Sequence, residues 1–429
     1  MEFEGEEKSN IPLLQGGRNR GRATSAQTLG NIVVSILGTG TLGLPFAFRV
    51  TGWAAGSLGL MLAGLVSYYC MLLLVECRRK SEEDTQETDK PAQTQTYGDI
   101  GDNAFGATGR FLTEFLILVS HAAASIAFFI FIGQNLSSVF TSFYVTISSS
   151  YFIYFLLLLL EVLLSFARSL SLLAPFSAFA TLCNVFAMAI VIKEDINKIG
   201  DHSFESANAF KGVWSIPFAF GVAVFCFEGF GVTLALERSM AKSSKFPWVL
   251  LQAFLGIAIA YIVFGSFGYL AYGEETQEII TLNLPNNWTT IIVKVGLCIA
   301  ITFTIPMIMH PIHEIIELKL RSCRWSQNLC HNSQTKGWLI SQVARLFVIV
   351  LLTMLATFAP GFAQLMSFTG STICALISFV LPASFHLKIM GSSLAPWRRV
   401  VDYCILLVGL VSAVYGAFAG LKATLDLFL

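Results

Sequence analysis

Eleven long apolar blocks divide this chain, and few charged residues interrupt them. A helix of about 20 apolar residues crosses a bilayer core of about 30 Å, so each block is long enough to span a membrane. Only helices and closed barrels satisfy every backbone N–H and C=O in hydrocarbon, and unbroken runs such as Leu156 to Leu160 fit helices. The blocks lie at about 28–50, 53–77, 110–140, 149–167, 171–192, 213–237, 246–272, 289–316, 337–358, 361–387 and 399–426.

The composition excludes most water-soluble functions. Apolar residues make up 55% of the 429 residues and charged residues 13%, whereas soluble domains carry roughly 25% charged residues. The two longest loops, at about 78–109 and 193–212, are too small and too polar to be catalytic domains. The net charge is zero, which gives no sign of nucleic-acid binding. We therefore predict an all-α polytopic membrane protein that is not an enzyme.

Lys and Arg predict the orientation in the bilayer. With the N-terminus in the cytosol, the cytosolic segments hold 20 of these residues and the opposite side holds five. Cytosolic segments of membrane proteins carry this excess of positive charge. The sequence thus predicts a cytosolic N-terminus and, after eleven spans, a C-terminus on the lumenal or outer side.

No group of ligands predicts a metal or another cofactor. Cys323, Cys330 and His331 lie close together in the sequence, but the fourth ligand that structural zinc takes is missing at a suitable spacing. We expect no metal, no cofactor, and a monomer in the lipid bilayer.

The first block contains a glycine-rich interruption, Gly38-Thr39-Gly40-Thr41-Leu42-Gly43-Leu44-Pro45. Glycine costs about 1 kcal/mol and proline about 3 kcal/mol in a helix interior, so we expect an unwound segment here. Unpaired backbone at membrane depth is tolerated where it is buried in protein or lines a cavity. Its N–H groups would attract a carboxylate.

The sixth block has a second interruption, Phe225-Cys226-Phe227-Glu228-Gly229-Phe230-Gly231. Paired interruptions at matching positions of two halves indicate inverted repeats with a ligand site between them. A single glycine cluster more often serves close helix contact, but two in register favour the site. We therefore expect a cytosolic tail at 1–27, a first repeat at 28–192, a second repeat at 213–388 and an additional helix at 397–429.

These same segments resemble the amino acid/auxin permease family, and most of all its plant vacuolar branch that carries aromatic and neutral amino acids. The resemblance rests on the Gly-Thr-Gly-Thr-Leu-Gly-Leu-Pro core with Thr51-Gly52-Trp53, and on 227–231 leading to Leu236-Glu237. It implies a LeuT-like fold of eleven helices, proton-linked transport of small amino acids or auxin, and a location in the vacuolar membrane, with the plasma membrane as alternative. Some relatives carry a functional histidine in the first span, and this chain has none there.

Glu228 and His121 are the candidates for proton coupling. A mid-bilayer carboxylate costs about 2.5 to 3.5 kcal/mol on insertion scales, so it is usually functional or paired. Glu228 could equally be a structural acid that binds loosened backbone N–H groups. His121 titrates near physiological pH, but a neutral histidine bonded to a carbonyl is the commoner case.

The candidate substrate-binding residues come from both interruptions and from the third and eighth spans. They are Gly38, Thr39, Gly40, Thr41, Gly43, Phe225, Phe227, Gly229, Phe230, Ser120 and Thr302. Ordinary packing is the default for a phenylalanine in a chain with 37 of them, and threonine is common in membrane helices. Two other functions remain open, namely sodium-coupled amino acid transport and an amino-acid sensor that moves little substrate.

Overall fold

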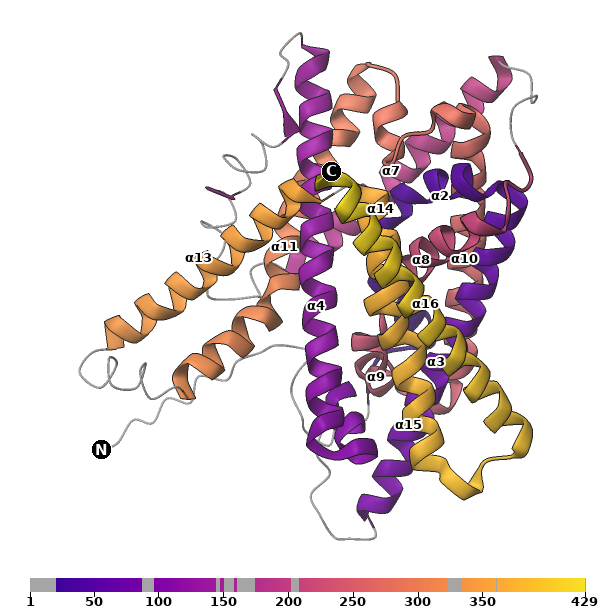
Figure 1. Cartoon of the computed structure of the whole chain (residues 1–429), viewed down its shortest axis with the longest axis vertical. Helices are drawn as coiled ribbons and strands as arrows, with labels where there is room; N and C mark the ends of the chain where they lie inside the picture. The colour runs from indigo at the N-terminus through magenta and orange to yellow at the C-terminus, as the bar shows by residue number, and fades with distance from the viewer. Residues whose placement is uncertain are drawn as a thin grey trace.

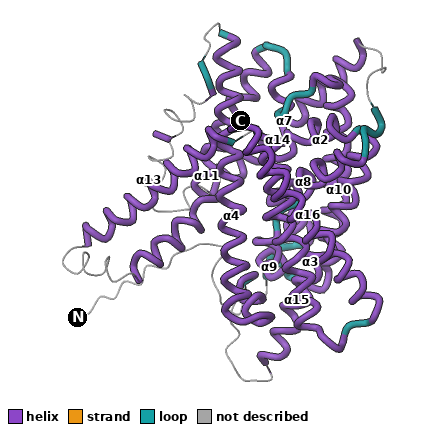
Figure 2. The backbone as a smooth tube through the Cα atoms, in the orientation of Figure 1, coloured by secondary structure: helices purple, strands orange, loops and turns teal. Residues whose placement is uncertain are grey.

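The structure, a computed structural model, describes residues 21–86, 96–143, 147–149, 158–159, 174–201, 208–322, 334–359 and 361–428. Within these ranges every regular element is a helix, and the loops that Figure 2 draws in teal are short. Eight of the described helices are long and apolar enough to cross a membrane, and the pair Ser25–Ile36 and Thr39–Thr51, bent by 50°, makes a ninth candidate. Outside the described residues lies nearly all of the predicted fourth span, 149–167. The same holds for Cys323, Cys330 and His331.

The helices follow the predicted blocks in order. They are α1 (Ser25–Ile36), a 3-10 segment (Thr39–Gly43), α2 (Leu44–Thr51), α3 (Trp53–Gln86), α4 (Tyr97–Ser142), α7 (Ala174–Asp201), α8 (Ile216–Cys226), α9 (Phe230–Ser239), α10 (Phe246–Tyr272), α11 (Trp288–Ser322), α13 (Gln334–Phe358), α14 (Phe362–Thr369), two π-helical turns (Gly370–Cys374 and Leu376–Val380), α15 (Leu381–Met390) and α16 (Pro396–Phe428).

The loop predicted at 78–109 is much shorter in the structure. Helix α3 continues to Gln86, and α4 already begins at Tyr97, where Thr96 caps it and exchanges hydrogen bonds with Asp99. The chain then turns at Gly106, whose φ of 67° suits a residue without a Cβ. Charge and polarity suggested a linker, but the cap makes helix from Tyr97 onward.

The helices form two groups, and the first of them contains the interrupted helices. Helices α1, α2, α3, α8, α9 and α10 contact one another, while α4 packs on α11 and α13, and α11 packs on α7 and α13. Figure 1 shows α2 and α7 toward one end of the bundle and α9 and α15 toward the other. We call the end that holds Ser25 and Ser239 the inner end, and the end that holds Thr51 and Gly273 the outer end.

Helix α16 lies directly on the tenth span and packs through glycines. A Cβ added to Gly409, Gly416 or Gly420 would collide with side chains of the tenth span. The collision partners include Ser371 and Phe368. Small residues of this kind let helix backbones approach closely in a membrane.

Candidate binding cavity

The first interruption is a real break in the helix. Helix α1 ends at Ile36, and Leu37 and Gly38 have extended or irregular backbone before the 3-10 segment begins. Both the N–H and the hydroxyl of Thr41 donate to the carbonyl of Gly38, at 3.3 and 2.9 Å. Since this is where the hydrogen bonds of the 3-10 segment begin, the N–H groups of Gly38, Thr39 and Gly40 precede them, as at any helix start.

The second interruption is shorter. Helix α8 ends at Cys226, and α9 begins at Phe230 after the extended residue Gly229. A Cβ on Gly229 would lie 3.1 Å from Ile36 Cγ1, so the glycine allows the two interruptions to meet closely. The unwound residues that the sequence predicted are therefore present in both spans, side by side.

Tyr261 of α10 joins the two breaks. Its buried hydroxyl lies 3.2 Å from the carbonyl oxygen of Ile36 and 3.3 Å from that of Cys226. Each of these carbonyls is the last of its half-helix and has lost its helical partner. One hydroxyl thus supplies a donor to both helix ends and holds them together.

A cavity of about 240 Å³ lies at the breaks. It extends along α1 as far as Val34 and along α11 as far as Ile308, which is toward the inner end. On the outer side of the break, Leu44, Phe48 and Phe362 are only 1% exposed and close the space. The lining residues of the first and sixth spans are Val34 to Thr41, Phe225, Cys226 and Glu228. The other spans contribute Ser120, Ala124, Phe128, Ala180, Thr181, Asn184, Tyr261, Leu297, Ala300, Ile301, Thr304 and Ile308.

Seven of the residues singled out in the sequence line this cavity. They are Gly38, Thr39, Gly40, Thr41, Ser120, Phe225 and Glu228. Glu228 is the one acid among the described lining residues, and it comes from the second break. The pairing of the two glycine-rich segments thus places backbone N–H groups, carbonyls and one carboxyl group around a single space.

The other residues singled out lie away from the lining. Phe227 is fully buried and stacks on Phe254 at 5.6 Å between ring centroids, and Phe230 is also fully buried. Thr302 donates to the carbonyl of Cys298 at 2.7 Å, and Gly43 faces Met366. Gly229, as described, packs on Ile36. In this conformation these residues support the walls of the cavity and do not form its surface.

His121 stands behind the wall, close enough to Glu228 for their charges to interact. Its Nδ1 lies 2.7 Å from the carbonyl oxygen of Ile117. Because a carbonyl only accepts hydrogen bonds, Nδ1 carries a hydrogen, and Nε2 is the nitrogen that can gain or lose a proton. The carbonyl contact expected of a packed histidine is present, and it leaves the second nitrogen free of that bond.

Sequence reasoning missed several polar lining residues. Asn184 of α7 is 4% exposed, and its amide nitrogen donates to the carbonyl of Leu37 at 3.4 Å. The sequence also singles out two threonines of α11 as candidate sodium ligands, and of these Thr304 lines the space whereas Thr302 does not. Asn184 and Tyr261 are polar residues within apolar blocks, which was a signal available in the sequence.

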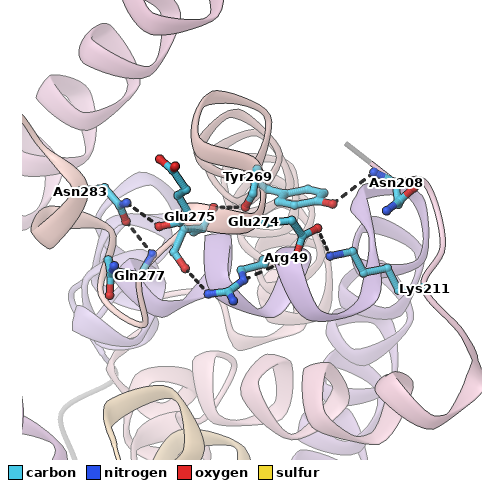
Figure 3. Close-up of polar contacts among 10 residues, drawn as sticks. Arg49, Asn208, Lys211, Tyr269, Glu274, Glu275, Gln277 and Asn283 are labelled. Carbon is cyan, nitrogen blue, oxygen red and sulfur yellow. Dashed lines mark hydrogen bonds and ion pairs between the residues drawn. The ribbon is translucent and has the colours of Figure 1, made fainter. Parts of the chain in front are cut away.

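Polar contacts join several segments at the outer end (Figure 3). Arg49 of α2 donates to the carbonyl of Thr276 at 2.8 Å and lies 3.9 Å from Glu274, which also pairs with Lys211. Tyr269 accepts a hydrogen bond from the N–H of Asn208 at 3.1 Å. These contacts fasten the end of α2 to the loops that follow α7 and α10.

The inner end is fastened differently. The N–H of Ala23 donates to the carbonyl of Ser239, and the N–H of Ala241 donates back to Ala23, both at 3.0 Å. Nearby, the fully buried carboxylate of Glu237 pairs with Arg78 and, at 2.9 Å, with Arg79. Helix α1 is thus tied to the end of α9, and α9 is tied to α3.

No cluster of three or more potential metal ligands occurs among the described residues. The cavity itself offers backbone groups, hydroxyls, an amide and one carboxyl group. Such groups bind a small zwitterion by charge and hydrogen bonding, and the apolar side chains around them suit an apolar substituent.

Comparison with known proteins gives consistent results. A family model described as "Transmembrane amino acid transporter protein" matches residues 21–421. Amino acid transporter ANT1 of Arabidopsis thaliana is 48% identical over 423 residues, which are 96% of each chain. Amino acid transporter AVT3B of the same plant is 34% identical over 431 residues, which are 98% of each chain.

Solved structures resemble the fold. MhsT in complex with L-phenylalanine matches with a TM-score of 0.53 at 11% identity, over 94% of this chain and 100% of that chain. Mhp1 with bromovinylhydantoin bound matches with a TM-score of 0.51 at 12% identity, over 96% of each chain. At such identities the likeness concerns the fold alone, and the predicted all-α, LeuT-like fold class is confirmed.

Proposed function

The chain belongs to the family of transmembrane amino acid transporter proteins, the amino acid/auxin permeases, and from that membership we propose that it carries neutral or aromatic amino acids, together with protons, by alternating access. The observation that carries the proposal is the cavity of about 240 Å³ where the two broken spans meet. Discontinuous helices of this kind supply helix-end charges to a substrate near the membrane midplane.

The cavity can hold each part of an amino acid. The N–H groups of Gly38, Thr39 and Gly40 would bind the carboxylate, as helix starts bind anions. The ammonium group would lie near the carbonyl of Leu37 and the carboxyl of Glu228, both at the breaks. The substrate side chain would then face an apolar wall, which consists of Phe128, Phe225, Leu297 and Ile301.

Glu228 is proposed as the proton carrier. It lines the cavity, and a buried carboxylate without a fixed cation is costly, so its protonation and the substrate ammonium would each offset its charge. His121 is proposed to accept or release the proton through Nε2. A proton or substrate drives the transition only through different affinities for the two conformations. Since the cavity extends toward the inner end and is closed on its outer side, we assign this conformation to the inward-facing half of the cycle.

Flux in proteoliposomes tests this proposal. The wild-type protein should take up radiolabelled L-phenylalanine and L-alanine faster than L-lysine, and an imposed proton gradient should raise the rate. Glu228→Gln should lose the response to the gradient. The matched control is Glu314→Gln, since Glu314 is 62% exposed at the inner end of α11 and should not matter.

Three results would contradict parts of the proposal. Full gradient-driven uptake by Glu228→Gln would remove that residue from coupling. Stimulation by a sodium gradient alone would favour the sodium-coupled alternative, for which the hydroxyl of Thr304 in the cavity is the one observation. Substrate binding without flux would favour a sensor.

We also propose the vacuolar membrane as location, with a cytosolic N-terminus and a lumenal C-terminus. The distribution of Lys and Arg supports this orientation, since 20 lie in the segments assigned to the cytosol and five on the opposite side. Protease protection of terminal tags in isolated vacuoles tests it. Cleavage of a C-terminal tag from the cytosolic side would overturn the orientation.

A further inference from the structure

A buried polar cluster joins the second, tenth and eleventh spans, and none of its members lines the cavity. Its centre is His386 of α15, which is 0% exposed. His386 Nδ1 lies 2.7 Å from Asp402 Oδ2 of α16, and Nε2 lies 3.3 Å from Glu76 Oε2 of α3. Asp402 is also 0% exposed, so two of the three groups are sealed from solvent.

Two further residues complete the cluster. Arg398 of α16 contacts Glu76 at 2.8 Å, and the hydroxyl of Tyr69 donates to Asp402 Oδ1 at 3.2 Å. The side chains of Glu76 and Arg398 remain 37% and 25% exposed. The cluster therefore has one sealed side, at His386 and Asp402, and one side that reaches the inner solution.

With both carboxyl groups ionised, the charges in this cluster balance when His386 holds two protons. Asp402 and Glu76 contribute two negative charges and Arg398 one positive charge, so a neutral imidazole leaves one negative charge in a largely buried place. A neutral ring would also leave Nε2 with a lone pair 3.3 Å from the carboxylate of Glu76, because Nδ1 donates to Asp402. An added proton on Nε2 removes both problems.

The described residues around the cluster offer no second cation beside Arg398. The groups of α3 that can titrate near the cluster are Tyr69, Cys70, Glu76 and Cys77, and those of α16 are Arg398 and Asp402. From α4, Tyr97 packs on Phe385 and donates to the carbonyl of Ile377 at 2.6 Å, so it is already occupied. Lys388, on α15 itself, is exposed. With both carboxyl groups ionised, a proton on His386 supplies the missing positive charge among these described groups.

We propose that His386, Asp402 and Glu76 form a proton-binding site that fastens α16 to α3 and α15, and that α16 loosens at the inner end when the proton leaves. Glu76 is the entry point, since it alone of the three reaches solvent. The ligand is a proton from the inner solution. This inference stands apart from amino acid transport, because it concerns how three helices are held together.

The test is a pH titration of purified protein in detergent, with no transport measurement. The apparent melting temperature of the wild-type protein should fall by about 2 °C between pH 5.5 and pH 8, since loss of the proton leaves an unbalanced buried charge. His386→Gln should lower the melting temperature at pH 5.5 and remove most of the fall. The matched control is His310→Gln, since His310 is 45% exposed and 3.9 Å from Glu314, and it should titrate like the wild type.

A second measurement does not depend on a variant that folds. Hydrogen exchange of the segment 396–405, corrected for intrinsic rates, should rise several-fold in the wild-type protein from pH 5.5 to pH 8. Glu76→Gln, a change at the exposed edge, should reduce this rise. The proposal would be overturned if the melting temperature of His386→Gln fell with pH as much as that of the wild type. It would also be overturned if the corrected exchange rate did not change with pH. Failure of amino acid flux would leave both readouts untouched.

Discussion

The two ends of the first span are held by different kinds of contact. At the outer end, Arg49, 34% exposed, lies 3.9 Å from Glu274, which is 56% exposed. At the inner end, α1 is paired through its backbone with the end of α9, whose Glu237 is fully buried against Arg78. Exposed ion pairs contribute little, whereas a buried carboxylate that loses or leaves its partner is expensive.

This difference teaches which end opens more readily. The outer contacts can separate into water and regain hydration, so their loss costs little. The inner contacts of Glu237 can be broken only by uncovering a charged group or by moving α3 and α9 together. We infer that α3 and α9 move as a unit, whereas the contacts of the outer loops break and form again one by one.

The largest effect should come from Glu237→Gln. It leaves the buried guanidinium of Arg78 with only the more exposed Glu82, at 3.5 Å, so the free energy of unfolding should fall by about 3 kcal/mol. The measurement is the fraction of monodisperse protein that survives heating. The outer-end control, Glu274→Gln, should lower the free energy of unfolding by less than about 1 kcal/mol. Equal losses from both variants would erase the distinction between the two ends.

A smaller effect is expected midway between the ends, from Tyr261→Phe. The ring remains, but Ile36 and Cys226 lose their shared donor, which should cost about 1 kcal/mol, equivalent to about a fivefold slower uptake if the broken conformation is the one that binds substrate. Initial uptake rates in proteoliposomes measure it. Tyr403→Phe, on the exposed face of α16, serves as control. Unchanged uptake would mean that the two breaks do not need the bridge.

Arg49→Gln should have a still smaller effect on stability, about 0.5 kcal/mol at low salt. The part of this loss that comes from the exposed ion pair with Glu274 should largely disappear in about 1 M KCl, where charges are screened within about 3 Å, and the part that comes from the hydrogen bond to Thr276 should remain. Melting temperatures at the two salt concentrations provide the measurement. A large, salt-independent loss would show that the outer end is held as firmly as the inner one.

The smallest effect should be the pH response of Glu278 in the outer loop. Burial raises the pKa of Glu278, although the N–H of Ala363 at 3.2 Å opposes that shift. The folded protein therefore keeps this proton to higher pH than the unfolded chain, so stability falls as the pH rises above about 4.5. Glu278→Gln should reduce the change in melting temperature between pH 4 and pH 7. The same change at the exposed Glu275 should not. A steeper curve for Glu278→Gln would reverse the assigned sign.

Local signals were sufficient to locate both breaks. Glycine and proline act on their own backbone, so Gly38 to Pro45 and the segment at 225–231 could be placed without knowledge of any neighbour. Which side chains line the cavity could not be predicted in the same way. Phe225 lines the cavity and Phe227 packs on α10. Residues two positions apart lie on different faces of a helix, but the sequence does not show which of the two faces meets the cavity.

Contacts between distant segments were beyond the sequence. The cluster of Glu76, His386 and Asp402 joins residues more than 300 positions apart, and each looked like an ordinary polar residue near a helix end. Tyr261 and Asn184 carried a signal, since polar groups in apolar spans need partners. The sequence could not name those partners, Ile36, Cys226 and Leu37, because they are backbone carbonyls set free by the fold.

The glycines of α16 bear on how this chain can be shortened. Gly409, Gly416 and Gly420 leave room for the tenth span to sit almost backbone to backbone against the last helix. A protein cut before residue 396 would present lipid with a surface shaped for another helix, including the hydroxyl of Ser371 and two π-helical turns. The eleventh helix therefore serves as an integral wall for the ten before it, and engineered truncations should end beyond it.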